Sequence, residues 1–287
     1  MDKDTIFNLL ENNDKMPRLP ENISDILLML KNPKDTDISL LAQKVSESGQ
    51  LNELVIQNLN SGYYQIHKKI NSIREAVVYL GMHTVQNLII FFISRQLFYD
   101  LPHANKARSF NMPQYWRHVI GTSVAGDMLC SLTNLGDRYK IFSYGLLHDI
   151  GIALVDACLP DMIDEVSKKV MAGSHQLVAE RVVFGGLTHA DIGAWLCRKW
   201  NIREDITEIV EFHHTPSLAK TDTVDLKIVH TADLFSTMYY ERLLGLTANR
   251  ALNSKTIDFL GITEADTQAI IEALPQEVDK LHNYFIV

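Results

Sequence analysis

Helical periodicity runs through almost the whole chain and constrains its fold more than any other feature of the sequence. Apolar residues recur three and four positions apart in stretches such as 23–30, 51–59 and 226–235. No convincing run of alternating apolar and polar residues indicates a strand. Helices that are apolar along one face bury that face against one another. The sequence therefore predicts an all-α fold, a bundle of many helices.

Composition places the chain among ordinary globular proteins. Hydrophobic residues make up 46% of 287 residues, enough for a substantial core in one large domain or two smaller ones. The formal net charge of -8 argues against sequence-independent binding to nucleic-acid backbones. Cys130, Cys158 and Cys197 are far apart and form no CxxC pair. We expect them to be reduced and buried, as in a cytoplasmic protein.

Neither a secretory signal nor a membrane span is expected. The acidic N-terminus lacks the basic and apolar regions of a signal peptide. The most apolar stretch, 88–98, is too short to cross a bilayer and contains Ser94, Arg95 and Gln96. We therefore expect a buried helix here, a cytoplasmic location and no membrane partner.

Polar, turn-prone residues at 105–111 indicate the main division of the chain. Pro113 follows, at a position that the first turn of a helix tolerates. We expect an N-terminal helical subdomain over 1–107, a second helical subdomain over 108–245 and a C-terminal helical extension over 246–287. The second subdomain is predicted to contain one long helix over about 115–132 and another over about 141–157.

Capping patterns predict where two further helices begin. Ser72 and Glu75 have the spacing of a capping box, and Gly81 is expected to end the helix that they open. Thr188 and Asp191 have the same spacing, with Asp in place of Glu. A helix is therefore expected to begin immediately after Thr188.

Histidines and aspartates with plausible metal-ligand contexts are concentrated between residues 118 and 233. Each lies on a predicted helix or at its end, and bundle cores build metal sites from such side chains. Imidazole and carboxylate together suit iron, manganese, zinc or nickel, and a carboxylate can bridge two metals. We expect a transition-metal centre, dinuclear and with iron first among these metals. The expected ligands are His118, His148, Asp149, His189, His213, His214 and Asp233.

Each of these residues taken singly has a simpler explanation. A buried histidine more often makes a hydrogen bond to a neighbour, Asp149 could cap a helix, and His213-His214 could neutralise a helix C-terminus. Adjacent residues on a helix face different ways, so His148-Asp149 suits the edge of a helix beside a shared cavity. His67 and His103 are expected in solvent, and His230 is expected to support a ligand. Only the ordered set indicates a metal.

At these residues the sequence resembles the HDOD family, the "HD-related output domain" of bacterial signalling proteins, over roughly 16–220. The resemblance rests on several short motifs in each half. In the N-terminal half they are Leu19-Pro20, Ile38-Ser-Leu-Leu-Ala-Gln-Lys-Val45, Leu59-Asn-Ser-Gly-Tyr-Tyr64, Ile70-Asn-Ser-Ile-Arg-Glu-Ala-Val77 and Leu80-Gly81. In the second half they are Trp116-Arg-His118, Gly145-Leu-Leu-His-Asp-Ile-Gly151, His189-Ala-Asp-Ile-Gly193, Trp200 and His213-His214.

The resemblance implies a helical fold of the HD superfamily and a regulatory output function. Many family members have lost the metal ligands, whereas this chain has kept them. The superfamily pattern of H, HD and a later D matches His118, His148-Asp149 and Asp233. The further histidines of the related HD-GYP cyclic-di-GMP phosphodiesterases match His189, His213 and His214.

Two departures from the HD-GYP pattern bear on catalysis. After the histidine pair, this chain continues with Thr215-Pro216-Ser217 instead of a GYP segment. Ile152 stands where the relatives carry a lysine after His-Asp-Ile-Gly, which removes a cation that could contact a phosphate or donate a proton.

Two main functions follow from these observations. The first is a non-catalytic signalling module whose N-terminal helices bind a signalling protein and whose metal-bearing half is a structural or ligand-sensing core. The second is a metal-dependent phosphohydrolase or phosphodiesterase that acts on a linear or cyclic nucleotide. Arg117, Lys140 and Arg181 could hold a phosphate, although each is equally well a solvated charge.

A third function, DNA binding through a helix-turn-helix at 38–62, is disfavoured. Two short helices are predicted to meet at Ser48-Gly49, but the second contains no Arg or Lys. Recognition helices usually carry such residues for the major groove and the phosphates. We therefore expect a signalling protein or a small nucleotide ligand as the partner, and not a nucleic acid.

Overall fold

The structure, a computed structural model, describes residues 2–30, 36–64, 66–99, 108–221, 223–243 and 254–285. Within these ranges the chain forms helices and no strand, which confirms the predicted all-α fold. The helices are α1 (Lys3–Glu11), α2 (Glu21–Leu30), α3 (Ile38–Glu47), α4 (Gly49–Leu59), α5 (Ile73–Tyr99), α6 (Met112–Thr133), α7 (Arg138–Gly145), α8 (Ile150–Cys158), α9 (Pro160–Met171), α10 (Gln176–Val183), α11 (His189–Lys199), α12 (Glu204–Phe212), the 3-10 helix η1 (Pro216–Leu218), α13 (Val224–Leu243), α14 (Ser254–Leu260) and α15 (Glu264–Phe285).

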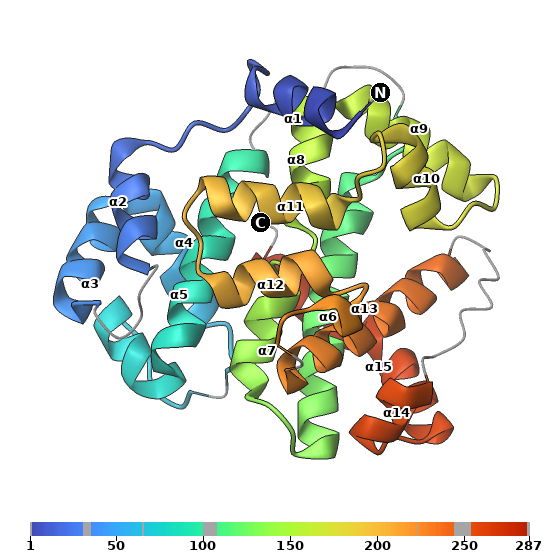
Figure 1. Cartoon of the computed structure of the whole chain (residues 1–287). Helices are drawn as coiled ribbons and strands as arrows, with labels where there is room; N and C mark the ends of the chain where they lie inside the picture. Colours follow the sequence, from blue (N-terminus) through green and yellow to red (C-terminus); the bar gives the residue numbers. More distant parts are fainter. Residues whose placement is uncertain are drawn as a thin grey trace.

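The helices form two groups joined through α5, as Figure 1 shows. Helices α2, α3 and α4 pack around α5, and α5 in turn packs against α7 and α8 of the larger group. In the larger group α6 contacts α7, α13 and α15, while α11 packs on both α8 and α12. The C-terminal helix α15 thus packs against α6 and α13. The expected subdomain boundaries lie at 107/108 and 245/246. They fall at or within two ranges, 100–107 and 244–253, that are outside the described residues.

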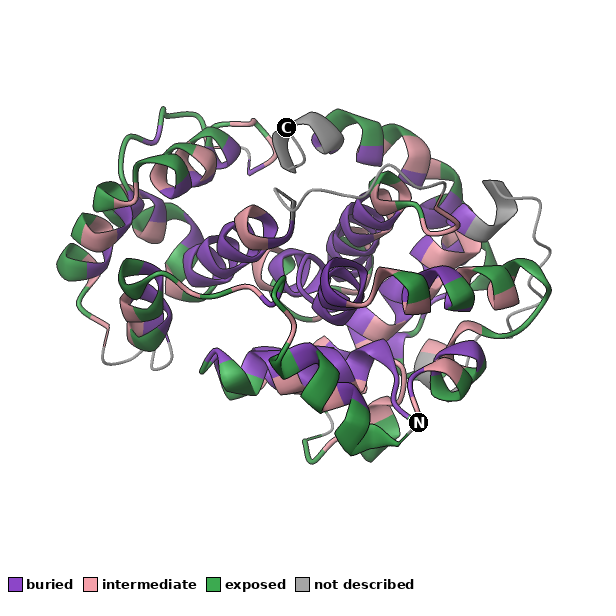
Figure 2. Ribbon diagram, turned by 90° about the horizontal axis from the view of Figure 1, so that it is seen from above, coloured by how far each residue is buried: buried purple, intermediate pink, exposed green. Residues whose placement is uncertain are grey.

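A continuous hydrophobic core extends through both groups of helices. Helix α8 is buried along its whole length and α6 over most of its length. Figure 2 shows buried helices in the middle of the molecule, with exposed residues on the outer faces of the helices around them. Cys130, Cys158 and Cys197 are free and buried, as the sequence predicted. The core therefore surrounds the segments that carry the predicted metal ligands.

Two apolar segments, Ile73–Phe98 and Arg138–Cys158, are long and apolar enough to cross a membrane by length and composition alone. In the fold, 67% and 100% of their most apolar windows are buried by other parts of the chain. Buried core helices of soluble proteins can be equally long and apolar, so these two segments are weak evidence for a membrane span.

The predicted helix start at Ser72 is confirmed, and at the predicted end, Gly81, the helix meets a second one across a kink within α5. The Glu75 amide donates to Ser72 Oγ at 3.2 Å, and the Glu75 carboxylate accepts from the amide of Asn71 at 2.9 Å. Gly81 has a φ of 76°, a left-handed conformation that glycine adopts at low cost, and it bends α5. The buried second part of α5 is the core helix expected over 88–98.

The long helix expected over 141–157 is wrong, because the chain breaks it at 146–149. Helix α7 ends at Gly145 and α8 begins at Ile150, with a tight turn between them. The ring of His148 donates from Nδ1 to the carbonyl of Gly145 at 2.7 Å. This bond occupies a carbonyl that would otherwise accept from the next turn of the helix. The His-Asp pair therefore lies in a turn and not on a helix face.

Helix α15 runs through Pro275 to Phe285, within the expected C-terminal extension, and Leu274 and Val278 are both fully buried beside the proline. Two other helices differ from the sequence prediction. Helices α1 and α10 were not predicted, since each has fewer than ten residues and only a short apolar pattern.

Candidate metal centre

The structure brings all seven predicted ligands together inside the larger helical group. They come from five separate segments of the chain: α6, the turn between α7 and α8, the first residue of α11, the end of α12, and the middle of α13. Their ligand atoms form two clusters, each with all its atoms within 4.8 Å of one another. One cluster contains His118, His148 and Asp233, and the other contains Asp149, His189, His213 and His214.

In the first cluster, imidazole nitrogens surround two carboxylate oxygens. His118 Nε2 lies 3.2 Å from Asp149 Oδ2 and 3.3 Å from Asp233 Oδ1. His148 Nε2 lies 3.4 Å from the same Asp149 oxygen. Asp149 belongs to the second cluster, but its Oδ2 faces the histidines of the first. Its carboxylate is therefore shared between the two clusters.

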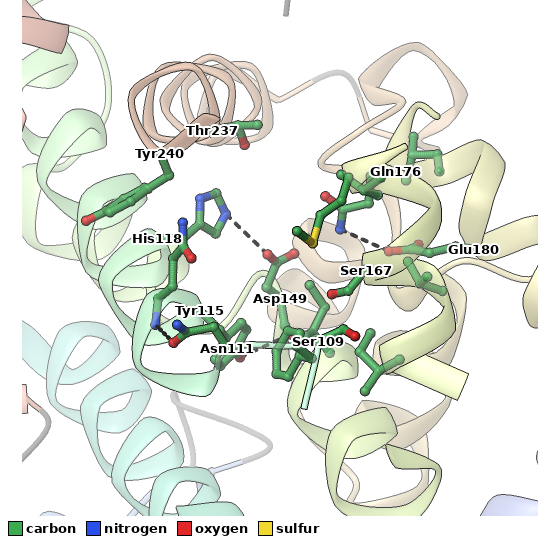
Figure 3. A pocket seen from close by; sticks show the side chains of 18 of the residues that line it. Ser109, Asn111, Tyr115, His118, Asp149, Ser167, Gln176, Glu180, Thr237 and Tyr240 are labelled. Atoms are coloured by element: carbon green, nitrogen blue, oxygen red, sulfur yellow. Dashed lines mark hydrogen bonds and ion pairs between the residues drawn. The ribbon is translucent and has the colours of Figure 1, made fainter. Parts of the chain in front are cut away.

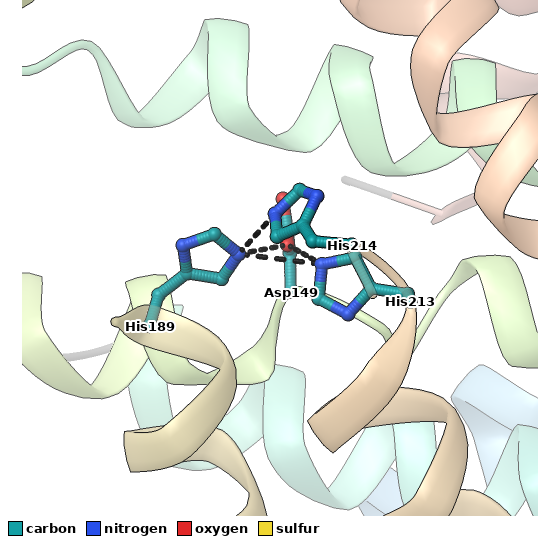
Figure 4. A group of neighbouring side chains, drawn as sticks. All are labelled: Asp149, His189, His213 and His214. Atoms are coloured by element: carbon teal, nitrogen blue, oxygen red, sulfur yellow. Dashed lines mark hydrogen bonds and ion pairs between the residues drawn. The ribbon is translucent and has the colours of Figure 1, made fainter. Parts of the chain in front are cut away.

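The second cluster, drawn in Figure 4, has three imidazoles around the other oxygen of Asp149. Asp149 Oδ1 lies 3.0 Å from His189 Nε2 and 3.4 Å from His213 Nε2. His189 Nε2 is also 3.0 Å from His214 Nε2, while His214 Nδ1 is 3.2 Å from Asp233 Oδ2. Nitrogens that share one focus in this way have the arrangement of ligands around a cation.

Outer hydrogen bonds orient the histidine rings toward this focus. His213 donates from Nδ1 to the carbonyl of Val210 at 2.9 Å, just as His148 does to Gly145. Each ring then leaves Nε2, which carries a lone pair in this tautomer, facing the carboxylates. His230, expected to support a ligand, donates from Nδ1 to the backbone carbonyl of His213 at 2.6 Å.

Glu180 is a functional residue that the sequence analysis missed. It is fully buried on α10, and its two oxygens lie 2.8 Å from His189 Nδ1. A carboxylate behind a ligating histidine orients the ring and makes it a stronger ligand. The only sequence signal is an acidic residue nine positions before His189, on a short helix that was not predicted.

The pKa values in the cluster are shifted because carboxylates and imidazoles are buried side by side. Burial would lower the pKa of His148, but the nearby carboxylates of Asp149 and Asp233 raise it to about 10. Burial would raise the pKa of Asp149, but His148 and His189 hold it well below its usual value. In His213, burial and the neighbouring His214 lower the pKa to about 3. Protons or metal ions can supply the charge that the two aspartates need.

Two buried polar atoms of the cluster make no well-aligned hydrogen bond. They are His148 Nε2 and Asp149 Oδ1, although each lies 3.0–3.4 Å from an ion-pair partner among the described residues. An absent ion is one explanation for such atoms in a native structure. The side chain of Asp149 caps no helix, although it precedes α8, so the simpler explanation for this residue fails. The donor set and these two atoms therefore fit a transition metal.

Two glycines let the ligand-bearing helices approach closely. A Cβ added to Gly151 on α8 would lie 2.0 Å from the carbonyl oxygen of His189, and one added to Gly193 would lie 2.7 Å from the side chain of Val210. Helices α8 and α11 thus touch backbone to backbone. The capping box predicted at Thr188 and Asp191 is present in full, so α11 begins at His189 with a defined orientation.

A cavity of about 510 Å³ opens beside the cluster. His118, Asp149, His214 and Asp233 reach its surface, whereas His148, His189 and His213 lie deeper. Figure 3 shows Ser167, Gln176 and Glu180 across the cavity from His118.

No Lys or Arg lines the cavity among the described residues. The three cations considered from the sequence do not reach it. Arg117 pairs with Asp279, Lys140 pairs with Asp225, and Arg181 is exposed elsewhere on α10. His67 is exposed as predicted, whereas His103 lies outside the described residues.

Comparison with known proteins yields one family and several similar structures. The family model of the HDOD domain matches residues 16–216. An HDOD domain protein of unknown function from Geobacter sulfurreducens is 21% identical with a TM-score of 0.72, and the similarity covers 100% of both chains. A provisionally named metal-dependent phosphohydrolase from Shewanella amazonensis SB2B is 18% identical with a TM-score of 0.60, over 98% of both chains. At these identities the structures share the fold alone.

A curated but uncharacterized protein of Treponema pallidum (strain Nichols) is 25% identical over 212 residues. The matched region covers 70% of this chain and 38% of that relative. The chain thus spans well under half the length of the relative.

Proposed function

Because the chain belongs to the HDOD domain family, we propose that it is a regulatory signalling protein built around a bound, dinuclear transition-metal centre. The observation that carries the proposal is the convergence of six other candidate ligands around the shared carboxylate of Asp149. One metal would be held by His118, His148 and Asp233, the other by His189, His213 and His214, with Asp149 between them.

The donor set supports iron first, with manganese, zinc or nickel as alternatives, because imidazole and carboxylate suit these ions. When bound, such a metal would act as a Lewis acid on an oxygen ligand and lower the pKa of a bound water. The chain's own residues orient the ligands: Gly145 and Val210 accept from the outer nitrogens of His148 and His213, and Glu180 accepts from His189.

Two features favour regulation over catalysis on a nucleotide. Ile152 lines the cavity as an apolar side chain, and no Arg or Lys lines it among the described residues. Phosphates are usually held by such cations. We infer a cytoplasmic protein whose helices α2–α5 contact a signalling partner, with the metal centre as a structural or ligand-sensing core.

A metal-dependent phosphohydrolase is the second candidate, and the open cavity favours it. Purely structural metal sites are closed by their protein ligands, whereas catalytic sites keep a position for water or substrate. Here four of the proposed ligands reach a cavity large enough for a small molecule.

Elemental analysis tests the proposed centre. Protein purified without chelators is expected to contain about two transition-metal ions per chain, and chelation is expected to lower its melting temperature because the folded state alone binds them. Metal-free protein whose melting temperature is unchanged by chelator would contradict the proposal.

A hydrolysis screen separates the two candidates. The metal-loaded protein is tested against cyclic dinucleotides, nucleotides and an aryl phosphate, with Asp149→Ala as the comparison. The regulatory proposal expects no turnover above that of the variant. Activity that disappears in Asp149→Ala would make the phosphohydrolase the better function.

A further inference from the structure

The wall of the cavity opposite the cluster is apolar. Ile152 of α8, Ile163, Val166 and Val170 of α9, and Leu177 of α10 line this side. Small-molecule pockets of about 300–1,000 Å³ bury most of a ligand against such walls, and this cavity of about 510 Å³ lies in that range. The wall suits an uncharged, apolar ligand body, because burying hydrocarbon contributes about 0.8 kcal/mol per methylene.

The polar groups around the cavity are neutral or acidic apart from the histidines. Among the described lining residues, Asn111, Gln114 and Gln176 carry amides, and the formal charges belong to Asp149, Glu180 and Asp233. A ligand with several negative charges would find no Arg or Lys among the described lining residues, so only the proposed metals would offset these carboxylates. The walls therefore disfavour a polyphosphate or a cyclic dinucleotide.

The metal side of the cavity can accept one negative charge. In the proposed centre two divalent ions would bring four positive charges, and the buried carboxylates of Asp149, Asp233 and Glu180 offset three of them. One positive charge remains where His118 and His214 reach the cavity. A single anionic head group would neutralise it.

We propose that the cavity binds a small amphipathic monoanion, with its anionic head group at the His118 and His214 edge of the metal centre and its apolar body against α8 and α9. A medium-chain monocarboxylate represents this class. The inference rests on the proposed function, because the head group needs the positive charge of the bound metals.

Calorimetric titration of the full, metal-loaded chain tests the ligand class with three probes. Octanoate is expected to bind, and octan-1-ol, which has the same chain without the charge, is expected to bind about tenfold more weakly or worse. Cyclic di-GMP, with two phosphates, is expected to bind more weakly than octanoate. Octanol binding as tightly as octanoate, or cyclic di-GMP binding more tightly, would overturn the inference.

A matched pair of variants tests the location. Val170→Glu puts a carboxylate into the half-buried wall and is expected to weaken octanoate binding about tenfold or more, because an anion in an apolar wall repels the ligand and costs desolvation. Val182→Glu makes the same change at an exposed position, 67% accessible on α10, and is expected to leave binding unchanged. Equal octanoate affinity in the two variants would overturn the location.

Ser167→Glu replaces Val170→Glu in this test if a thermal melt shows that Val170→Glu does not fold. Ser167 is already polar and lies half-buried on the same wall. The same weakening is expected of it. The metal content of each titrated sample separates the two possible failures. Metal-free protein would overturn the proposed function and the inference together, whereas metal-loaded protein without octanoate binding would overturn the inference alone.

Discussion

Two buried polar networks in the larger helical group differ in one respect that bears on function. The first is the seven-residue cluster around Asp149, and the second is centred on Arg203, which is 3% exposed. Arg203 donates to both oxygens of Asp205 at 2.9 and 2.7 Å and to Gln86 at 2.8 Å, and Tyr144 donates to Asp205 at 2.6 Å.

The Arg203 network satisfies its own members, whereas the Asp149 cluster does not. No atom of Arg203, Asp205 or Tyr144 is among the buried side-chain atoms that lack a partner in the described residues, but His148 Nε2 and Asp149 Oδ1 are. Burial of charge is common to both networks. The convergence of several ligand atoms, and not burial, therefore distinguishes the Asp149 cluster from the Arg203 network, which joins helices α5, α7 and α12.

The largest expected effect comes from removing the shared carboxylate. Asp149→Asn keeps the size of the side chain but removes the charge that faces both clusters, so we expect loss of nearly all bound metal. The loss should exceed the roughly 10–100-fold weakening typical of residues that only support a ligand. Elemental analysis measures it, with Asp205→Asn as the control that retains metal. Full metal content in Asp149→Asn would show that the two networks are alike.

Arg203→Met should damage stability instead of metal binding. It leaves Asp205 without its main partner, and removing one member of a buried ion pair costs several kcal/mol. The side chain of Asp205 is 37% exposed, so water compensates in part, and we expect a loss of about 3 kcal/mol in the free energy of unfolding. Urea denaturation measures the loss. Metal depletion in the folded variant would contradict a purely structural role.

Glu180→Gln tests the outer support of the second cluster. The amide keeps a hydrogen-bond acceptor near His189 but removes the charge, so metal affinity should fall roughly 10–100-fold at the position held by His189. Competition with a chelator measures it, and Glu165→Gln, an exposed change on α9, is the matched control. Equal affinity in both variants would show that Glu180 only fills space.

The stability contributed by each network should change with pH in opposite directions. In the metal-free fold the pKa of His148 is raised from 6.5 to about 10, so the stability from its protonated form is complete below pH 6.5 and lost as pH rises toward 10. Metal displaces this proton, so metal affinity should rise by up to about tenfold per pH unit across that window. Chelator competition measures the rise, and affinity independent of pH would contradict it.

The Arg203 network should fail in acid instead. Burial would raise the pKa of Asp205, but hydrogen bonds and charge from Arg203 lower it from 3.8 to about 2. Its stabilising contribution is therefore present above pH 3.8 and lost as pH falls toward 2. Comparison of acid unfolding in wild type and Asp205→Asn measures this contribution.

Many of the candidate metal ligands could be predicted because they stand in short, recognisable sequence patterns. The adjacent His148-Asp149, the pair His213-His214 and the capping box before His189 are each recognisable without knowledge of the fold. The all-α class followed from periodicity in the same way. The structure thus brings together residues that short sequence patterns had singled out.

The rest depends on side-chain contacts that sequence patterns do not reveal. The break at 146–149 arises from the ring of His148 bonding to Gly145, which competes with the helix and has no pattern in the sequence. Glu180 acts through a histidine on another helix. The division of the ligands into two clusters follows from the packing of α6, α8, α11, α12 and α13, which periodicity does not specify.

The close packing around Gly151 and Gly193 would bear on the rate at which the proposed metals exchange. Helices α8 and α11 touch backbone to backbone, and the inner rings of His148 and His213 are 0% exposed, while the side chains of His118 and His214 are 15% and 20% accessible. Ions would enter and leave past these two outer histidines, through the cavity. A molecule bound in the cavity would lie across that route, so it would slow metal release even without changing the equilibrium affinity.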